Sequence, residues 1–289
     1  MAVNNSEGRL YICPTPIGNL EDITLRALSV LKEVDLIACE DTRESGKLLS
    51  HYDIHTSLTS YHDHNRTGKG KKLIELLLSG KSIALISDAG MPGISDPGED
   101  IIGECIENGI EYTVLPGASA GITALVGSGL PTGRFVFEGF IPKTGRERKI
   151  RLSELAAEKR TIILYESPHN LIKTLADVRE ALGFRKLTII REISKRFEEK
   201  IHTDTCSAET LFKDKAPRGE FVLVISGISK EELQKEKAER YSGISLEEHL
   251  KIYTDKGIKK NEAMKMVAND LGISKREVYS KLLEKKSPC

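Results

Sequence analysis

The sequence predicts an α/β protein with two consecutive α/β domains followed by a small, helix-turn-helix-like domain. Short apolar runs alternate with segments of helical spacing from Leu10 onward, which is typical of a mainly parallel sheet covered by helices on both faces. A second series of this kind starts near Arg134, and the chain after Ser245 carries helical patterns only. We therefore expect an N-terminal α/β domain over residues 1–132, a C-terminal α/β domain over 133–229, a linker over 230–244 and a helical domain over 245–289.

Each apolar run of the first domain is short enough for a strand and stops at polar or turn residues. Between the runs, leucines recur three residues apart, for example at Leu25, Leu28 and Leu31, which is a helical spacing. We expect strands at 10–13, 36–39, near Leu58, at 83–86 and at 112–115, with helices between them.

The second domain repeats this order with different residues. We expect strands at 135–137, 161–165, 187–190 and 220–225, a charged helix from about Thr144, and part of a hairpin at 195–201.

The C-terminal segment has the outline of a helix-turn-helix. Asn261 can cap one helix, Gly272 lies in a turn, and Ser274 with Glu277 has capping-box spacing at the start of the next helix. Ten Lys and Arg against seven Asp and Glu from Ser245 to Cys289 make this segment mildly basic. A nucleic-acid contact and a helical dimerisation or packing module both fit.

The stretch from Ser87 to Gly98 is the strongest sign of a ligand site. It follows a buried apolar run, is rich in glycine and proline, and carries two carboxylates before a helical pattern begins. Glycine allows a ligand to approach the main chain closely. A plain strand-to-helix connection is the alternative, but such connections are usually shorter.

Composition and the absence of common motifs exclude several classes of protein. Lys plus Arg and Asp plus Glu are both 43, so a nucleic-acid site must be a local patch. The polar start of the chain and the absence of an apolar run of ~20 residues predict neither a signal peptide nor a membrane span. Five widely spaced cysteines without C-x-x-C fit a reduced, cytoplasmic protein. Walker A, H-E-x-x-H, G-x-G-x-x-G and G-x-S-x-G sequences are missing.

Seven motifs in order resemble one family. They are PTPIGNLEDITLRAL (14–28), CEDTR (39–43), SDAGMPGISDPG (87–98), LPGASA (115–120), EGFIP (138–142), ESPH (166–169) and REISKRFEE (191–199). The set is similar to the tetrapyrrole-methylase superfamily and, within it, to the methyltransferases that modify the ribose 2′-hydroxyl of a cytidine in the decoding region of 16S rRNA.

The resemblance implies S-adenosylmethionine in a cleft between two α/β domains, a homodimer, and 16S rRNA or the small ribosomal subunit as partner. It implies that the cofactor is held largely by the main chain of the loop after Ile86, with help from the second domain. The implied cofactor residues are Pro16, Ser87, Asp88, Ala89, Gly90, Ile94, Ser95, Asp96, Pro97, Ala118, Ser119, Ala120, Tyr165, Glu166, Gly219 and Glu220.

Transfer of a methyl group to a hydroxyl needs an acceptor for the proton. The candidate catalytic residues are Glu40, Lys195 and Glu199. Asp41 fits a helix cap better than chemistry, and Asp88 either contacts the cofactor or shapes an Asx turn. The candidate RNA-binding residues are Arg43, Arg146, Arg148, Lys149 and Arg191, although a basic helix face is more often simply solvated.

A metal site is not expected, because His62 and His64 lack further ligands nearby in sequence. Two other functions remain open. A small-molecule methylase acting on a tetrapyrrole would need neither the helical tail nor the basic helix. A non-catalytic DNA-binding regulator with a ligand-sensing body is favoured by the tail alone.

Overall fold

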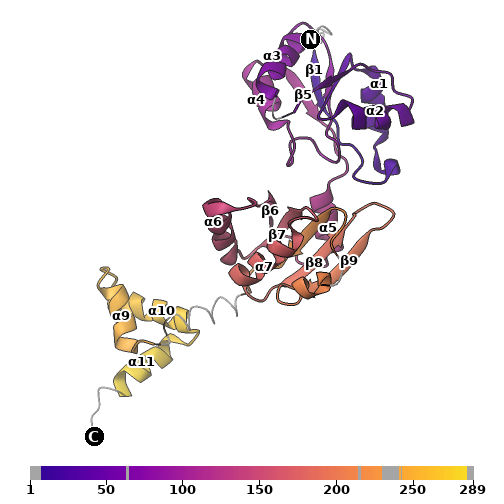
Figure 1. Cartoon of the computed structure of the whole chain (residues 1–289). Coiled ribbons are helices and arrows are strands. Elements are labelled where there is room, and N and C mark those ends of the chain that lie inside the picture. Colours follow the sequence, from indigo (N-terminus) through magenta and orange to yellow (C-terminus); the bar gives the residue numbers. More distant parts are fainter. Residues whose placement is uncertain (1–7, 63–64, 214–215, 230–240, 242, 285–289) are drawn as a thin grey trace. The chain divides into compact units, whose positions relative to one another are not determined.

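The computed structural model describes residues 8–62, 65–213, 216–229, 241 and 243–284. The chain forms two compact units, Met1–Leu155 with Arg160–Ser226, and Ala156–Lys159 with Gly227–Cys289. The first unit contains two five-stranded sheets, and we call the part built on each sheet the N-terminal lobe and the C-terminal lobe (Figure 1).

The sequence predicted a mainly parallel sheet, and the sheet of the N-terminal lobe is entirely parallel. Its strands lie in the order β3-β2-β4-β1-β5, and every pairing between them is parallel. The strands are β1 (Arg9–Ile12), β2 (Leu36–Cys39), β3 (Leu58–Ser60), β4 (Ile83–Leu85) and β5 (Glu111–Val114). Their carboxyl ends therefore share one edge, where ligands bind in sheets of this type.

Alternating side chains of these strands bury both faces of the sheet. Ile83 and Leu85 pack in one cluster with α3 (Arg66–Leu78) and α4 (Glu99–Glu107), while Ala84 packs in another with α1 (Leu25–Glu33) and α2 (Thr42–His51). A central parallel strand must be apolar throughout because helices cover both its faces. This explains why the strands read as continuous apolar runs.

The C-terminal lobe has a mixed sheet in the order β6-β7-β10-β8-β9. Its central strand β10 pairs antiparallel with both β7 and β8, and β9 pairs antiparallel with β8, which confirms the predicted hairpin. The strands are β6 (Phe135–Phe140), β7 (Thr161–Glu166), β8 (Lys186–Arg191), β9 (Glu199–Asp204) and β10 (Phe221–Ile225).

Helices also cover both faces of this sheet. One face packs on α6 (Gly145–Ala156) and α7 (Leu171–Leu182). The other packs on α5 (Ala120–Gly127), whose Ala124 and Leu125 lie in a cluster with Ile163 and Val222. The helix that follows the last strand of the N-terminal lobe thus belongs to the core of the C-terminal lobe.

Among the described residues of the second unit, three helices share a core: α9 (Leu246–Thr254), α10 (Lys260–Leu271) and α11 (Lys275–Glu284). The capping box of Ser274 and Glu277 is present, and Gly272 ends α10 in the left-handed conformation. The expected cap Asn261 is wrong, because α10 begins one residue earlier and Asn261 lies in its first turn. Helix α9 was not predicted. Most of the expected linker, residues 230–240 and 242, lies outside the described residues.

The described part of the chain contains no helix long and apolar enough to cross a membrane.

Candidate functional site

A cavity of about 490 Å³ lies in the first unit, which is a typical size for a small-molecule site. Its walls come from segments that follow β1, β2, β4 and β5 in the N-terminal lobe, and from β6, β7, β10 and the segment after β8 in the C-terminal lobe. The lining residues are Ile17, Glu40, Asp88, Ala89, Gly90, Met91, Ile94, Ser95, Asp96, Ser119, Ala120, Phe140, Tyr165, Glu166, Ser167, Pro168, Ile193, Glu220, Phe221 and Val222.

The loop after β4 is shaped by main-chain hydrogen bonds. The Thr15 amide donates to the Gly90 carbonyl at 2.9 Å, and the Gly90 amide donates back to Thr15 at 3.1 Å. The Ser87 hydroxyl donates to the Gly90 carbonyl at 3.1 Å and is buried. Ser87 thus stabilises the turn and does not line the cavity, whereas Asp88 to Met91 do.

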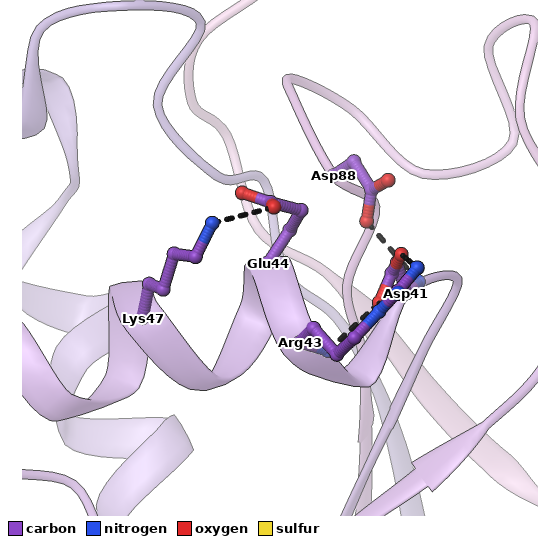
Figure 2. Close-up of polar contacts among 5 residues, drawn as sticks. All are labelled: Asp41, Arg43, Glu44, Lys47 and Asp88. Atoms are coloured by element: carbon purple, nitrogen blue, oxygen red, sulfur yellow. Dashed lines mark hydrogen bonds and ion pairs between the residues drawn. The ribbon is translucent and has the colours of Figure 1, made fainter.

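Asp88 connects the ends of two neighbouring strands (Figure 2). Its Oδ1 accepts a hydrogen bond from the amide of Asp41 at 3.2 Å, just before α2 begins. Asp41 itself caps α2, as expected, by accepting from the Arg43 amide at 2.8 Å. Hydrogen bonding by the Arg43 guanidinium lowers the pKa of Asp41 to about 2. Asp88 therefore fixes the strand end that carries Glu40, and both side chains line the cavity.

Tyr165 forms part of an aromatic wall. Its hydroxyl oxygen accepts from the Gly121 amide at 2.9 Å, and its ring meets Phe137 and Phe140 edge-on at centroid distances of 5.0 and 5.7 Å. Burial raises its pKa, the Gly121 bond acts the other way, and nearby Asp96 raises it further. Tyr165 therefore stays protonated at neutral pH.

Two carboxylates of the C-terminal lobe line the cavity, and both have polar partners within that lobe. Glu166, at the end of β7, accepts from the Ser167 amide at 2.8 Å and from the Thr174 hydroxyl at 2.5 Å. Glu220, just before β10, lies 2.9 Å from Lys195 Nζ.

Lys195 was expected as a catalytic residue, but its ammonium group is held by two carboxylates of the C-terminal lobe. Its Nζ contacts Glu192 Oε1 at 3.0 Å as well as Glu220. Burial acts to lower its pKa, but hydrogen bonds to these two carboxylates raise the pKa above its usual value. A lysine held in this way is a poor base. The raised pKa argues against base chemistry at Lys195, and a catalytic role of this residue stays a prediction.

Glu199 also lies away from the cavity lining. It is in edge strand β9 and pairs with Arg191 at 3.0 Å. These two charges pair with each other within the sheet, and the catalytic role of Glu199 and the RNA contact of Arg191 stay predictions. Of the three catalytic candidates, only Glu40 lines the cavity.

The prediction that Arg148 contacts RNA is wrong. It is 4% exposed, and its guanidinium donates to Asp177, Pro142 and Thr174 within the C-terminal lobe. Its neighbours Arg146 and Lys149 are exposed on α6, and Arg43 is exposed on α2. These three remain predicted RNA contacts.

The expected cofactor residues divide into two groups. Eleven line the cavity: Asp88, Ala89, Gly90, Ile94, Ser95, Asp96, Ser119, Ala120, Tyr165, Glu166 and Glu220. The other five, Pro16, Ser87, Pro97, Ala118 and Gly219, are neighbours of lining residues in the sequence and lie outside the lining set. The apolar wall residues Ile17, Met91, Phe140, Ile193, Phe221 and Val222 were not anticipated, although each lies in a strand or in the segment that follows one.

The cavity has a distinct electrostatic character. Five carboxylates line it, from Glu40, Asp88, Asp96, Glu166 and Glu220, and none of the described lining residues is Lys, Arg or His. A ligand with positive charge and a flat, partly apolar portion fits such a cavity. An S-adenosylmethionine, with its sulfonium, ammonium and adenine groups, meets both requirements.

The fold and this cavity define a class of enzyme. The sequence profile of the tetrapyrrole (corrin/porphyrin) methylases matches residues 9–208, and the chain belongs to that family. It is 45% identical over 276 residues to the ribosomal RNA small subunit methyltransferase I of Halalkalibacterium halodurans, which covers 96% of this chain and 95% of that protein. The protein of the same name from Synechocystis sp. is 46% identical over 278 residues, covering 96% and 98%.

Solved structures share the fold of the first unit. A cobalt precorrin-4 methyltransferase superposes with a TM-score of 0.60 at 16% identity, covering 78% of this chain and 98% of that chain. Uroporphyrin-III C-methyl transferase from Thermus thermophilus, complexed with S-adenosyl homocysteine, has a TM-score of 0.54 at 18% identity, covering 76% and 97%. At these identities the likeness concerns the fold.

Proposed function

We propose that this protein is an S-adenosylmethionine-dependent methyltransferase that methylates the ribose 2′-hydroxyl of a cytidine in the decoding region of 16S rRNA. The observation that carries the cofactor assignment is the acid-lined cavity at the carboxyl ends of the parallel strands. The substrate assignment draws on the near full-length similarity to proteins named ribosomal RNA small subunit methyltransferase I.

The cofactor is held by both lobes in this proposal. The main chain from Asp88 to Asp96 and the start of α5 surround it on one side, with Tyr165, Glu166 and Glu220 on the other. The cofactor supplies an electrophilic methyl group. The lining carboxylates compensate its positive charge, and the apolar side chains exclude water from the transfer.

The hydroxyl proton goes to a carboxylate oxygen of Glu40. Glu40 is the one catalytic candidate that lines the cavity, and it extends from the strand end that Asp88 fixes. A positioned carboxylate can act as a general base.

RNA phosphates bind outside the cavity, because the described lining carries carboxylates and no cation. Arg146 and Lys149, both exposed on α6, together with exposed Arg43, supply positive charge. Such contacts position the RNA without reading its sequence.

We also propose that the protein is a homodimer and acts in the cytoplasm, where ribosomes are assembled. Apolar side chains on α5 and on edge strand β5 are exposed, among them Val126 at 69% and Val114 at 47%. A second copy of the chain would cover such surfaces. Light scattering of the full chain tests the dimer.

The central experiment offers labelled S-adenosylmethionine with small ribosomal subunits, free 16S rRNA, a porphyrinogen or duplex DNA. We expect label in RNA at one site that resists alkaline cleavage, because a 2′-O-methyl group removes the nucleophile of that cleavage. Label in the porphyrinogen instead would support a tetrapyrrole methylase. Binding of duplex DNA without any transfer would support a regulator.

A further inference from the structure

The C-terminal lobe contains a buried polar chain that ends at the cavity. It runs from Asp177 through Arg148 and Thr174 to Glu166, which lines the cavity. Three of its four members are nearly inaccessible, with Arg148 4%, Thr174 0% and Glu166 6% exposed. A buried charge is expensive unless it is paired and hydrogen-bonded, so a chain of this kind requires an explanation.

Each nitrogen of the Arg148 guanidinium donates one hydrogen bond within the C-terminal lobe. Nε donates to Asp177 Oδ2 at 2.7 Å, Nη1 donates to the Pro142 carbonyl at 2.8 Å, and Nη2 donates to Thr174 Oγ1 at 2.9 Å. These bonds join the start of α6, the end of β6 and α7. The fork geometry of arginine fixes the place of each partner.

Thr174 links the Arg148 guanidinium to the Glu166 carboxylate by hydrogen bonds. Its oxygen accepts from Arg148, so its single hydroxyl proton is directed to Glu166 Oε2 at 2.5 Å. The other carboxylate oxygen accepts from the Ser167 amide at 2.8 Å. The Ser167 hydroxyl also donates to this oxygen, at 3.5 Å. Both oxygens of Glu166 thus have protein donors, and these set the orientation of the carboxylate in the cavity wall.

We propose that Arg148 and Thr174 are positioning residues that preorganise the Glu166 carboxylate to accept a hydrogen bond from the bound cofactor. The inference rests on the proposed function, since it requires S-adenosylmethionine in this cavity. Hydrogen bonds that polarise one another in a buried chain strengthen each other, so the loss of Thr174 is felt at Glu166. In this proposal Arg148, which the sequence suggests as an RNA contact, contributes instead to cofactor binding through Thr174 and Glu166.

The test measures S-adenosylmethionine binding to the full chain by calorimetry, alongside thermal melting. Thr174→Val keeps the side-chain volume but removes the hydroxyl, and we expect about tenfold weaker binding, as for loss of a hydrogen bond to a charged group. Thr174→Ser retains the hydroxyl and should restore binding to within about twofold of the wild type. Glu147→Gln, which changes the exposed residue just before Arg148 on α6, is the matched control and should bind as the wild type does.

A double-mutant cycle separates positioning from mere packing. If Thr174 acts through Glu166, the Thr174→Val change should have no further effect on binding in a Glu166→Gln background. Additive losses would overturn the proposal, as would wild-type affinity in Thr174→Val. If Thr174→Val does not fold, Arg148→Lys replaces it in the same cycle, since lysine cannot hold all three partners.

The outcomes also separate this inference from the proposed function. A well-folded wild type that takes up no S-adenosylmethionine overturns both. A wild type that binds it, with a Thr174→Val variant that binds it equally well, overturns the positioning role alone.

Discussion

The hydroxyl of Tyr165 accepts a hydrogen bond from the amide of Gly121 at 2.9 Å, which joins the wall of the cavity to the first turn of α5. Gly121 is buried, and an added Cβ there would lie 3.3 Å from the same hydroxyl. The end of β7 and the start of α5 are therefore held together at one point that also lines the cavity.

Tyr165→Phe should destabilise the protein by roughly 1–3 kcal/mol, because it leaves a buried amide without an acceptor. We expect a lower melting temperature and weaker S-adenosylmethionine binding. Tyr112→Phe, at an exposed position of β5, is the control and should change neither. An unchanged melting temperature for Tyr165→Phe would show that the Gly121 bond contributes no stability.

Asp88→Ala should weaken S-adenosylmethionine binding by at least about tenfold, because it removes a cavity carboxylate and the acceptor of the Asp41 amide.

Glu40→Ala should leave cofactor binding nearly intact and lower kcat by about 10²-fold or more, as expected for loss of a general base. Glu44→Ala, which breaks the exposed pair with Lys47 in the same helix, is the control (Figure 2). Full activity in either cavity variant removes that residue from the proposed mechanism.

Replacing Arg146 and Lys149 by Glu should raise KM for the ribosomal substrate and leave the Kd of S-adenosylmethionine unchanged. The dependence of RNA binding on salt should also become shallower, by about 0.7 in the log–log slope for each phosphate that the variant no longer neutralises. Lys32→Glu, an exposed change at the end of α1, serves as a comparison. Equal salt slopes for all variants would exclude phosphate binding at α6.

Gly139→Ala should impair cofactor binding through the loop that carries Ser95. Gly139 has φ = 60°, and an added Cβ would lie 3.0 Å from Ser95 Oγ, so both the backbone and the contact disfavour a side chain. Gly133→Ala is a close control, because nothing lies within 4 Å of the Cβ added there and its φ is not positive. Similar binding by the two variants would contradict this prediction.

Thiol alkylation at pH 8 should modify Cys206 well before Cys13 and Cys105. Cys206 is exposed, whereas burial raises the pKa of Cys13 to about 12 and that of Cys105 to about 11. The thiolate is the reactive form, so buried thiols react only after unfolding. Because the folded pKa values lie above the unfolded ones, these thiols also favour the folded state below about pH 8.5, and this contribution disappears as the pH rises toward 11–12. Mass spectrometry of peptides from native and denatured protein locates the adducts, and early labelling of Cys13 would contradict the buried position.

The sequence predicted the strands of the N-terminal lobe well, because central strands such as β2 and β4 are buried on both faces and read as apolar runs. The Ser87–Gly98 loop was identified for the same reason, since its glycines and prolines interrupt such a run. Helix α9 was missed, although Ser245 and Glu248 form a capping box that the sequence shows.

The site residues were harder to predict, because their partners are distant in the sequence. Arg148 lies in a charged stretch and reads as exposed, yet it shares the buried face of α6 with Leu152 and Leu155, four and seven residues on. Lys195 reads as a free cation because Glu220, one of the two carboxylates that hold it, is 25 residues away. Nothing in local spacing reveals that pairing.

Strand β10 comes last in its sheet along the chain but lies in the middle, between β7 and β8. During synthesis, the hairpin β8–β9 therefore cannot join the pair β6–β7 in one sheet until the residues up to Ile225 have left the ribosome. The same segment delivers Glu220, Phe221 and Val222 to the cavity wall. Competence to take up the cofactor thus arises only with the last step of assembly of this lobe, and incomplete chains remain inactive.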